Sequence, residues 1–232
     1  METRYDRQTA LPEIGPEGQR RLAQAKVLVV GVGGLGSPIA IYLAAAGVGT
    51  LGLVDDDVVS VSNLQRQVLY CEQQQGQPKA ECARQRLEAL NSGITVNVYR
   101  TRLTADNARE LIAQYDIVVD GTDNFAARYA ISDACEALGK PYVYGAIKGL
   151  DGQVAVLCKG SATYRTLYPD NVDKEKFAPI DKAVAGVTPA VVGSVEASQV
   201  MQLVCGYGSP LVDRLWTIDL RTMQSFVVEI GK

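Results

Sequence analysis

Histidine is absent from the 232 residues of the chain. This absence excludes Ser-His-Asp triads, histidine-ligated metal centres and histidine proton shuttles. Any chemistry that the chain performs must therefore use carboxylates, lysine, arginine, cysteine or backbone groups.

Cysteine is sparse, and no two cysteines form a Cys-x-x-Cys pair. The five are Cys71, Cys82, Cys135, Cys158 and Cys205. Scattered spacing of this kind indicates neither a disulfide framework nor a zinc knuckle. We expect buried structural thiols at these positions.

Long apolar runs and an excess of one charge are also missing. No run approaches the length that spans a bilayer, and the first residues, Met-Glu-Thr-Arg-Tyr-Asp-Arg, contain no apolar signal core. The net charge of −3 gives no electrostatic reason to expect nucleic acid or an anionic membrane as partner. We therefore expect a cytoplasmic protein, with either one large α/β domain or, at a stretch, two small ones.

A glycine-rich turn follows an apolar run at Val27–Gly36, which reads Val-Leu-Val-Val-Gly-Val-Gly-Gly-Leu-Gly. The run is typical of a strand buried on both faces, and the Ala-rich stretch after it is typical of a helix. Gly31, Gly33 and Gly36 occupy the fingerprint positions of G-x-G-x-x-G, with Gly34 as an extra glycine. The pattern indicates a nucleotide whose phosphates lie at a helix N-terminus. Asp55, at the end of the second apolar run, is well placed to bind a ribose hydroxyl.

Strands and helices alternate up to about residue 145, which predicts a doubly wound, mostly parallel sheet of the Rossmann type. The pattern then changes to a strand at 154–157, a long polar stretch at 159–184, a helix at 188–205 and a closing hairpin. We expect these C-terminal strands to extend the sheet in antiparallel fashion. The polar N-terminal arm is either a solvated tail or a segment that reaches another subunit.

Charged side chains follow several predicted strands: Arg66, Lys79 and Asp123. Arginine and lysine neutralise phosphate charge, and a carboxylate binds the magnesium ion that a triphosphate brings. Lys79 stands at a predicted helix N-terminus, where a cation is unfavourable unless an anion lies beside it. Each residue also has a structural explanation: Asp123 or Thr122 could cap the next helix, and Arg66 could form a surface ion pair.

The chain resembles the ThiF/MoeB/HesA adenylyltransferases, bacterial relatives of the ubiquitin-activating enzymes. The strings that carry the resemblance are Gly31-Val-Gly-Gly-Leu-Gly36, Asp55-Asp-Asp57, Ser62-Asn-Leu-Gln-Arg-Gln67, Pro78-Lys79 and Thr122-Asp123-Asn124. Arg4-Tyr-Asp-Arg-Gln8 matches the family's opening, and Ala185-Gly-Val187 its closing segment. The resemblance covers essentially the whole chain, and the string at Ser62–Gln67 is its most specific part.

The resemblance implies that Mg·ATP adenylates the C-terminal glycine of a ubiquitin-like sulfur carrier of the ThiS or MoaD type, for thiamine or molybdopterin biosynthesis. It assigns catalysis to Arg66, Lys79, Asp123 and Arg7, with Asp123 binding magnesium and Arg7 reaching the partner's ATP site in a homodimer. The nucleotide-binding set is Gly31, Gly33, Gly34, Gly36, Asp55, Asp57, Ser62, Asn63, Leu64, Gln65, Arg66, Lys79, Asp123 and Asn124.

A single adenylation domain is expected over residues 1–232. It comprises an arm and helix (1–24), a nucleotide-binding half (25–150) and a carrier-binding half (151–232). The stretch at about 159–184 would be a mobile crossover loop over the channel that admits the carrier's Gly-Gly tail. The carrier's terminal carboxylate is ionised at pH 7, so it can attack the α-phosphorus without a general base.

Two departures from the family pattern affect metal and sulfur chemistry. The first zinc-binding Cys-x-x-Cys position reads Thr163-Tyr-Arg-Thr166, and no second pair precedes Lys232, so we expect no zinc. Lys182 stands where many relatives carry a cysteine. We therefore expect adenylation on this chain and sulfur delivery by a separate donor protein, with Cys158 and Cys205 as remote candidates for sulfur handling.

Two other classes of protein remain compatible with the glycine turn. An NAD-dependent oxidoreductase would use Asp55. In that class of protein, Arg66 and Lys79 would have no triphosphate to bind, and the sequence offers no candidate proton relay. A non-catalytic relative that binds carrier or nucleotide is favoured by the lost cysteines and opposed by the intact charged set.

Overall fold

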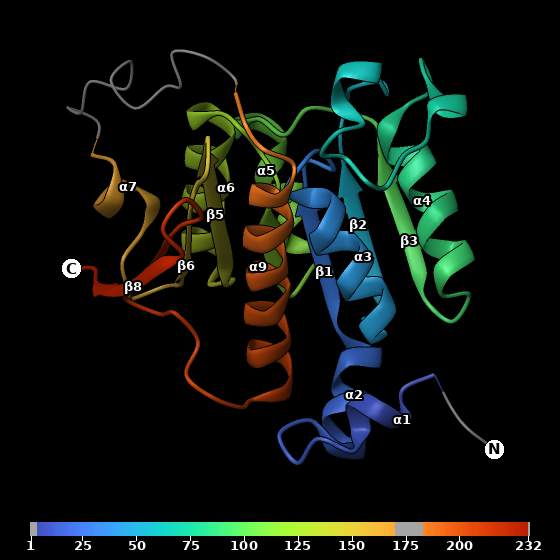
Figure 1. Ribbon diagram of the computed structural model, residues 1–232. Helices are drawn as coiled ribbons and strands as arrows, with labels where there is room; N and C mark the ends of the chain where they lie inside the picture. The colour runs from blue at the N-terminus through green and yellow to red at the C-terminus, as the bar shows by residue number, and fades with distance from the viewer. Residues whose placement is uncertain (1–3, 170–182, 232) are drawn as a thin grey trace.

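The computed structural model of the protein describes residues 4–169 and 183–231 (Figure 1). Eight strands form one sheet in the order β3-β2-β1-β4-β5-β6-β7-β8. Their bounds are β1 Lys26–Val30, β2 Thr50–Val54, β3 Thr95–Tyr99, β4 Ile117–Asp120, β5 Tyr142–Lys148, β6 Asp151–Leu157, β7 Arg214–Asp219 and β8 Gln224–Glu229.

The sheet is parallel from β3 through β5 and antiparallel from β5 through β8. The expected doubly wound sheet with an antiparallel C-terminal extension is therefore confirmed. The order reverses between β1 and β4, because β2 and β3 extend the sheet on one side and β4 onward on the other. In open α/β sheets, ligands bind at such a reversal, beyond the carboxyl ends of the strands.

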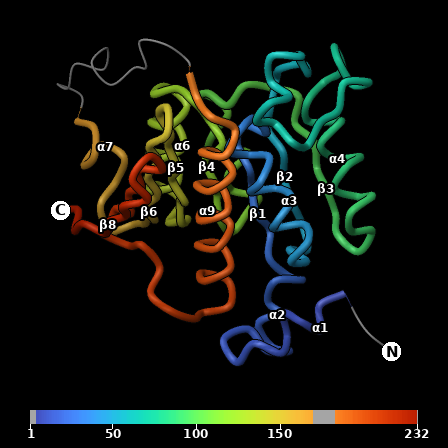
Figure 2. The backbone as a smooth tube through the Cα atoms, in the orientation of Figure 1, coloured from blue at the N-terminus to red at the C-terminus, as the bar shows by residue number. Residues whose placement is uncertain are grey.

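Helices cover both faces of the sheet, as the tube in Figure 2 shows. The principal helices are α2 Gly15–Gln24, α3 Gly36–Ala46, α4 Lys79–Leu90, α5 Ala105–Ala113, α6 Phe125–Leu138 and α9 Val187–Cys205. Side chains of α2, α3, α4 and α9 share one buried cluster, and those of α5 and α6 belong to the other. The strands of the central sheet are consequently buried on both faces, which explains their continuous apolar runs.

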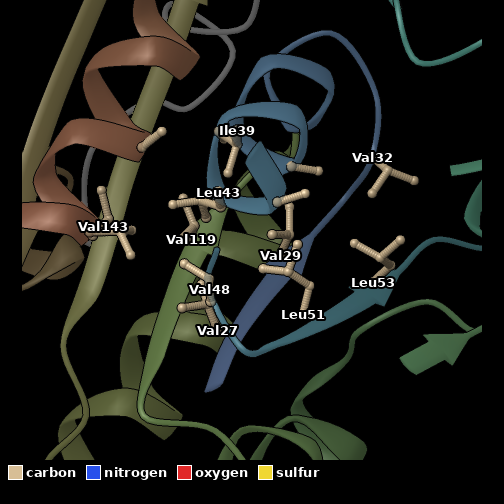
Figure 3. Close-up of a cluster of buried hydrophobic side chains, with 14 of the residues drawn as sticks. Val27, Val29, Val32, Ile39, Leu43, Val48, Leu51, Leu53, Val119 and Val143 are labelled. Carbon is tan, nitrogen blue, oxygen red and sulfur yellow. The ribbon is translucent and has the colours of Figure 1, made fainter. Parts of the chain in front are cut away.

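The larger buried cluster lies between α3 and the sheet. Val27, Val29 and Leu51 point from β1 and β2 toward the side of the sheet that α3 covers, and Leu53 of β2 lies beneath Val32 (Figure 3). Helix α3 also packs closely against α9. A methyl group on Gly193 of α9 would lie 2.6 Å from Pro38 Cγ of α3. This packing fixes the helix that follows the glycine turn, and α9 with it.

The N-terminal arm is folded onto its own chain. Residues Asp6–Thr9 form the short helix α1, and the Tyr5 hydroxyl accepts a hydrogen bond of 2.8 Å from Asn91 Nδ2. Gln8 Nε2 donates to Ala46 O at the end of α3. The interpretation of the described arm as a solvated tail is therefore wrong.

The polar stretch at 159–184 is only partly described. Tyr164–Leu167 forms the short helix α7, which the sequence did not predict. Residues 170–182, which include Lys182 and half of the expected crossover loop, lie outside the described residues. At the C-terminal side, β8 is the edge of the sheet and all six of its residues are exposed.

Candidate functional site

The glycine turn lies at the reversal of strand order. Gly31 has φ +84°, and a side chain there would lie 2.7 Å from Gly121 O, at the end of β4. Gly31 N donates to Val54 O, and Gly121 N donates to Val30 O, each at 2.7 Å. A side chain on Gly36 would overlap Gly31 O. The turns after β1 and β4 thus meet without room for side chains, which leaves backbone N–H groups at the start of α3 for a bound anion.

Asp55 supports this turn from the end of β2. Its carboxylate accepts hydrogen bonds of 2.9 Å from Val32 N and from Asp57 N. Burial raises the pKa of Asp55 above its usual value, while the two backbone donors and Lys79 oppose the shift. The Tyr70 hydroxyl donates a hydrogen bond of 2.7 Å to Val32 O and so holds the same turn through a second backbone group. Asp55 therefore lies next to the expected phosphate loop with a conformation that the backbone fixes.

Lys79 is paired with Asp57 in this structure. Its ammonium lies 2.9 Å from Asp57 Oδ2, and its backbone N–H donates to Asp57 O at 3.0 Å. The Lys79 side chain is only 6% exposed, whereas that of Asp57 is 69% exposed. The anion that a lysine at a helix N-terminus requires is therefore Asp57, and the expected contact of Lys79 with phosphate stays a prediction.

The string at Ser62–Gln67 folds over the glycine turn. Residues Val61–Asn63 form a 3-10 helix, and Asn63 O accepts from the N–H groups of Arg66 and Gln67. Arg66 Nη1 donates to Ser62 O at 3.0 Å, and Arg66 Cδ would lie 3.5 Å from a side chain on Gly34. The structure thus brings Arg66 beside the glycine turn without an ion pair among the described residues.

The rest of the string serves packing as well. Leu64 packs against the larger buried cluster, and the Ser62 hydroxyl lies 2.9 Å from that of Ser60. Gln65 O is so close to Gly186 that a side chain there would overlap it. These contacts tie the string to the segment before α9 and account for its order.

Asp123 and Asn124 belong to the loop between β4 and α6. Asn124 caps α6, because its side chain accepts a hydrogen bond of 2.9 Å from Ala127 N. Thr122 instead donates through its N–H and its hydroxyl to Asp120. Capping therefore does not explain Asp123, whose exposed carboxylate has neither a hydrogen bond nor an ion pair within the described chain.

Arg7 lies far from this group in its own chain. It belongs to α1, which contacts the C-terminal end of α3 through Gln8, whereas the glycine turn lies at the N-terminal end of α3. The 11 residues of α3 span roughly 16 Å. In Figure 1, α1 lies beyond the lower end of α3, whereas the turn between β1 and α3 lies at the upper end of that helix. Arg7 could therefore serve such a site only in another subunit.

Several polar residues around the turn were not assigned a role from the sequence. Gln67 is buried, and its Oε1 has no partner among the described residues; it stands within the quoted string. Asp120 and Arg128 form a buried ion pair of 3.2 Å beneath the Asp123 loop. Glu196 is fully buried in α9, and the signal for it was a single charged residue in an otherwise uncharged helix.

The cysteines differ in exposure. Cys82, Cys135 and Cys205 are buried, as expected, whereas Cys158 is half-buried and Cys71 is exposed, so the expectation is wrong for Cys71. Burial raises the pKa of Cys135 to about 12, which makes this thiol a poor nucleophile.

The side chains and helices of residues 4–169 and 183–231 bear on metal binding and on membrane insertion. No group of three or more acidic, cysteine or histidine side chains there could hold a metal ion by itself. No helix in these ranges is long and apolar enough to cross a membrane.

The ThiF family model matches residues 5–232 of the chain. The sulfur carrier protein adenylyltransferase of Thermus thermophilus is 48% identical over 93% of this chain and 82% of its own length. The probable adenylyltransferase/sulfurtransferase MoeZ of Mycobacterium tuberculosis is 43% identical over 99% of the chain, which spans only 60% of that relative. The SAMP-activating enzyme E1 of Haloferax volcanii is 42% identical over 95% of the chain and 82% of that relative.

Solved structures agree on the fold. E. coli MccB with ATP is 23% identical over the whole chain, with a TM-score of 0.88 and coverage of 72% of MccB. The relatives above confirm the expected class of enzyme, an adenylyltransferase, which uses ATP. The glycine turn, the charged string beside it and the match over nearly all residues lead to one conclusion: the chain belongs to the ThiF family.

Proposed function

We propose that the chain uses Mg·ATP to adenylate the C-terminal glycine of a ubiquitin-like sulfur carrier protein. The observation that carries this proposal is the meeting of the glycine turn with Arg66, Lys79 and the unpaired Asp123 at one edge of the sheet. The names of the Thermus and Haloferax relatives, a sulfur carrier adenylyltransferase and a SAMP-activating enzyme, support the substrate class.

The nucleotide would lie across the reversal of strand order. The N–H groups of Gly31 and Val32 already donate to Val54 O and Asp55, so phosphate oxygens would be held by the N–H groups that follow them in the turn. Asp55 would accept from the ribose. Asn63 and Arg66 come from the string that folds over the turn and would line the phosphates. The lack of a side chain on Gly34 supports this fit. A side chain there would contact Pro189 Cβ at 3.4 Å and Arg66 Cδ at 3.5 Å, and it would fill the space beside Arg66.

Asp123 fits a magnesium ion that arrives with the nucleotide. Magnesium in nucleotide sites is held by one or two carboxylates together with phosphate oxygens and water, so a cluster of protein ligands is not needed. Asp123 offers an exposed carboxylate with no competing cation among the described residues. When bound, magnesium would neutralise charge on the phosphates. Asn124 is less suited as a ligand, because its side-chain oxygen already caps α6.

The reaction requires no proton transfer. An oxygen of the carrier's terminal carboxylate attacks the α-phosphorus, a carboxyl–phosphate anhydride forms, and the bond to pyrophosphate breaks. Negative charge builds up on the α-phosphoryl oxygens and on the leaving pyrophosphate. Arg66 and Lys79 would stabilise this charge, and positioning supplies the remainder of the rate enhancement.

A homodimer would complete the site. Arg7 lies at the end of α3 remote from the glycine turn, so the site that it could reach belongs to a second copy. Apolar side chains that a second copy could cover are exposed around the turn and on α3: Tyr42, Val58, Val61 and Val68.

The C-terminal half would bind the carrier. Edge strand β8 exposes Phe226, Val227 and Val228. Because successive side chains of a strand point to opposite faces, Phe226 and Val228 share one face, which offers an apolar surface to the body of a folded partner. The stretch at 159–184 would cover the channel for the Gly-Gly tail. Sulfur would come from a separate donor protein, because Lys182 stands where many relatives carry a cysteine and because burial raises the pKa of the Cys135 and Cys158 thiols.

Carrier-dependent exchange between pyrophosphate and ATP tests the proposal. We expect exchange only with a carrier that ends in Gly-Gly, and Arg66→Ala should reduce its rate about 10²–10³-fold. Arg84→Ala is the matched control, since Arg84 is a half-exposed arginine on α4 that pairs with Glu81 and Glu88.

The outcomes separate the rival classes of protein. Nucleotide binding without exchange would indicate a non-catalytic relative, and binding of NAD in preference to ATP would indicate an oxidoreductase. A loss below a few-fold in Arg66→Ala would exclude a role for Arg66 in the transition state.

A further inference from the structure

Arg128 on α6 is a nearly buried cation beneath the loop that carries Asp123. Its side chain is 11% exposed, and its Nε lies 3.2 Å from Oδ2 of Asp120, which is completely buried. Burying an ion pair costs desolvation energy, which is recovered only when the remaining donors and acceptors are also bonded. The other groups that hydrogen-bond to Arg128 and Asp120 therefore indicate the role of this ion pair.

Those partners converge on Thr122. Arg128 Nη2 donates to Thr122 O at 2.8 Å and more weakly to Gly145 O at 3.3 Å. Asp120 Oδ1 accepts from Thr122 N at 2.8 Å and from the Thr122 hydroxyl at 2.7 Å. The backbone N–H, the backbone carbonyl and the side chain of Thr122 are thus all held by one buried ion pair.

Asp123 is the residue directly after this anchor. On its other side, Asn124 is fixed as the cap of α6 through Ala127 N. The Asp123 carboxylate has no bond of its own in the described chain, so its place is set through the backbone on either side. The exposed carboxylate is in this way preorganised by contacts that it does not make itself.

We propose that Arg128, together with Asp120, is the positioning residue for Asp123 in the nucleotide site. The inference rests on the proposed function, under which Asp123 binds the metal ion of the nucleotide. Functional carboxylates that are held in place bind metal without a further ordering cost, and residues that orient a metal ligand influence metal affinity strongly. Loss of the Arg128 fork should therefore weaken metal binding more than it weakens nucleotide binding.

A purely structural role for Arg128 makes a different prediction. Arg128 also lies over the Tyr144 ring at 5.4 Å, and Tyr142 donates to Asp120 Oδ2 at 2.7 Å. These contacts belong to the buried cluster beneath the loop and do not touch residues 121–124. If they were the reason for the arginine, variants would lose stability while metal affinity stayed unchanged.

Arg128→Lys is the informative variant, because it keeps the charge and loses the planar fork that bonds Asp120 and Thr122 together. Tyr142→Phe is the matched control, since it removes a hydrogen bond to the same carboxylate without touching the loop. Thr122→Val is a second test that leaves the buried ion pair intact and removes one anchor of the loop.

Mn²⁺ affinity of the full chain, saturated with a non-hydrolysable ATP analogue, can be measured by electron paramagnetic resonance without any carrier. We expect Arg128→Lys to weaken Mn²⁺ binding about 10-fold or more, and Tyr142→Phe to change it less than about twofold. Should Arg128→Lys fail to fold, weakened Mn²⁺ binding by Thr122→Val supports the proposal. Wild-type Mn²⁺ affinity in a folded Arg128→Lys or Thr122→Val overturns it.

The two proposals fail in distinguishable ways. Normal Mn²⁺–nucleotide binding that depends on Arg128, without carrier-dependent exchange, would overturn the proposed function alone. Exchange that is normal in the wild type and retains its Mg²⁺ dependence in Arg128→Lys would overturn the positioning role alone.

Discussion

Glu196 on α9 places its carboxyl group directly against the α-carbon of Gly145 on β5, and both of its oxygens lack hydrogen-bond partners among the described residues. A methyl group at position 145 would overlap the carboxyl group. Gly145→Ala should therefore lower the free energy of unfolding by about 1–3 kcal/mol, the usual cost of overpacking. Urea denaturation followed by circular dichroism measures the change.

The matched control is the double variant Gly145→Ala/Glu196→Ala. Removing the carboxyl group makes room for the new methyl, so the two substitutions should couple by about 0.5–3 kcal/mol in a double-mutant cycle. Strict additivity would show that the contact does not require glycine.

Burial gives Glu196 a pH-dependent effect on stability. The pKa of Glu196 is raised well above its usual value by burial and by Asp120, against the opposing effect of Arg128. The unfolded chain then releases this proton above about pH 4, while the folded chain retains it. The folded state binds more protons, so this carboxyl lowers stability by about 1.4 kcal/mol per pH unit until the folded pKa is reached.

Glu196→Gln cannot ionise and should escape that loss. We expect the variant to gain stability relative to the wild type as pH rises from 4.5 to 7.5, on the order of 1 kcal/mol or more. Urea denaturation at several pH values measures the difference between the two proteins. A difference that is constant across this range would mean that Glu196 titrates in the folded protein as it does in water.

Local patterns were sufficient to predict most of the fold. The central strands are buried on both faces and read as continuous apolar runs, and Gly47, Gly139 and Gly206 end their helices in the left-handed conformation that glycine favours. The start of the polar stretch after β6 escaped prediction. Its short helix α7 is stabilised by Tyr164 packing on Tyr129 of α6, a contact that no local periodicity encodes.

The site could be predicted only where a residue type or a motif indicates its chemical role without knowledge of the packing. The glycine turn and Asp55 are adjacent in space because parallel strands end at one edge of the sheet, which the sequence implies. Arg128 reads as an ordinary helix residue, since its partner Asp120 is identified only when strand and helix are packed together. The Lys79–Asp57 pair likewise depends on how the segment between β2 and α4 folds back.

Lys79→Met should separate activity from stability. Removing the buried ammonium leaves the carboxylate of Asp57 largely in water, so the pair's loss should cost about 1 kcal/mol or less, and methionine refills much of the space. If Lys79 stabilises charge on the phosphates, pyrophosphate–ATP exchange should fall about 10²–10³-fold. Thermal unfolding and exchange are measured on the same preparations.

Arg84→Met provides the control for Lys79, because it removes a cation from the solvent-facing side of α4. It should leave the exchange rate unchanged. A Lys79→Met protein that exchanges at nearly the wild-type rate would restrict this lysine to its pairing with Asp57.

Two glycines of the turn should respond differently to alanine. At Gly36 the new methyl would overlap Gly31 O, whereas at Gly34 it would make ordinary contacts of 3.4 Å with Pro189 and 3.5 Å with Arg66. Gly36→Ala should therefore lose about 1–3 kcal/mol of stability, and Gly34→Ala should stay within about 0.5 kcal/mol of the wild type. Equal urea midpoints for the two variants would contradict the close packing of the turn.

Zinc should be absent from the purified chain. Thr163 and Thr166, which stand at the positions of the family's first cysteine pair, bond to one another: Thr166 Oγ1 accepts from Thr163 N at 3.0 Å. Neutral hydroxyls do not replace the thiolates that a structural zinc requires. Two hydrogen bonds hold the segment around Thr163 instead. Tyr164 N donates to Ser132 Oγ at 3.1 Å, and Ala162 N donates to Asp213 Oδ1 at 2.7 Å. Plasma mass spectrometry should find well under one zinc per chain, and a chelator should leave the melting temperature unchanged, because no folding energy comes from the metal. About one tightly bound zinc per chain would instead require ligands elsewhere in the sequence.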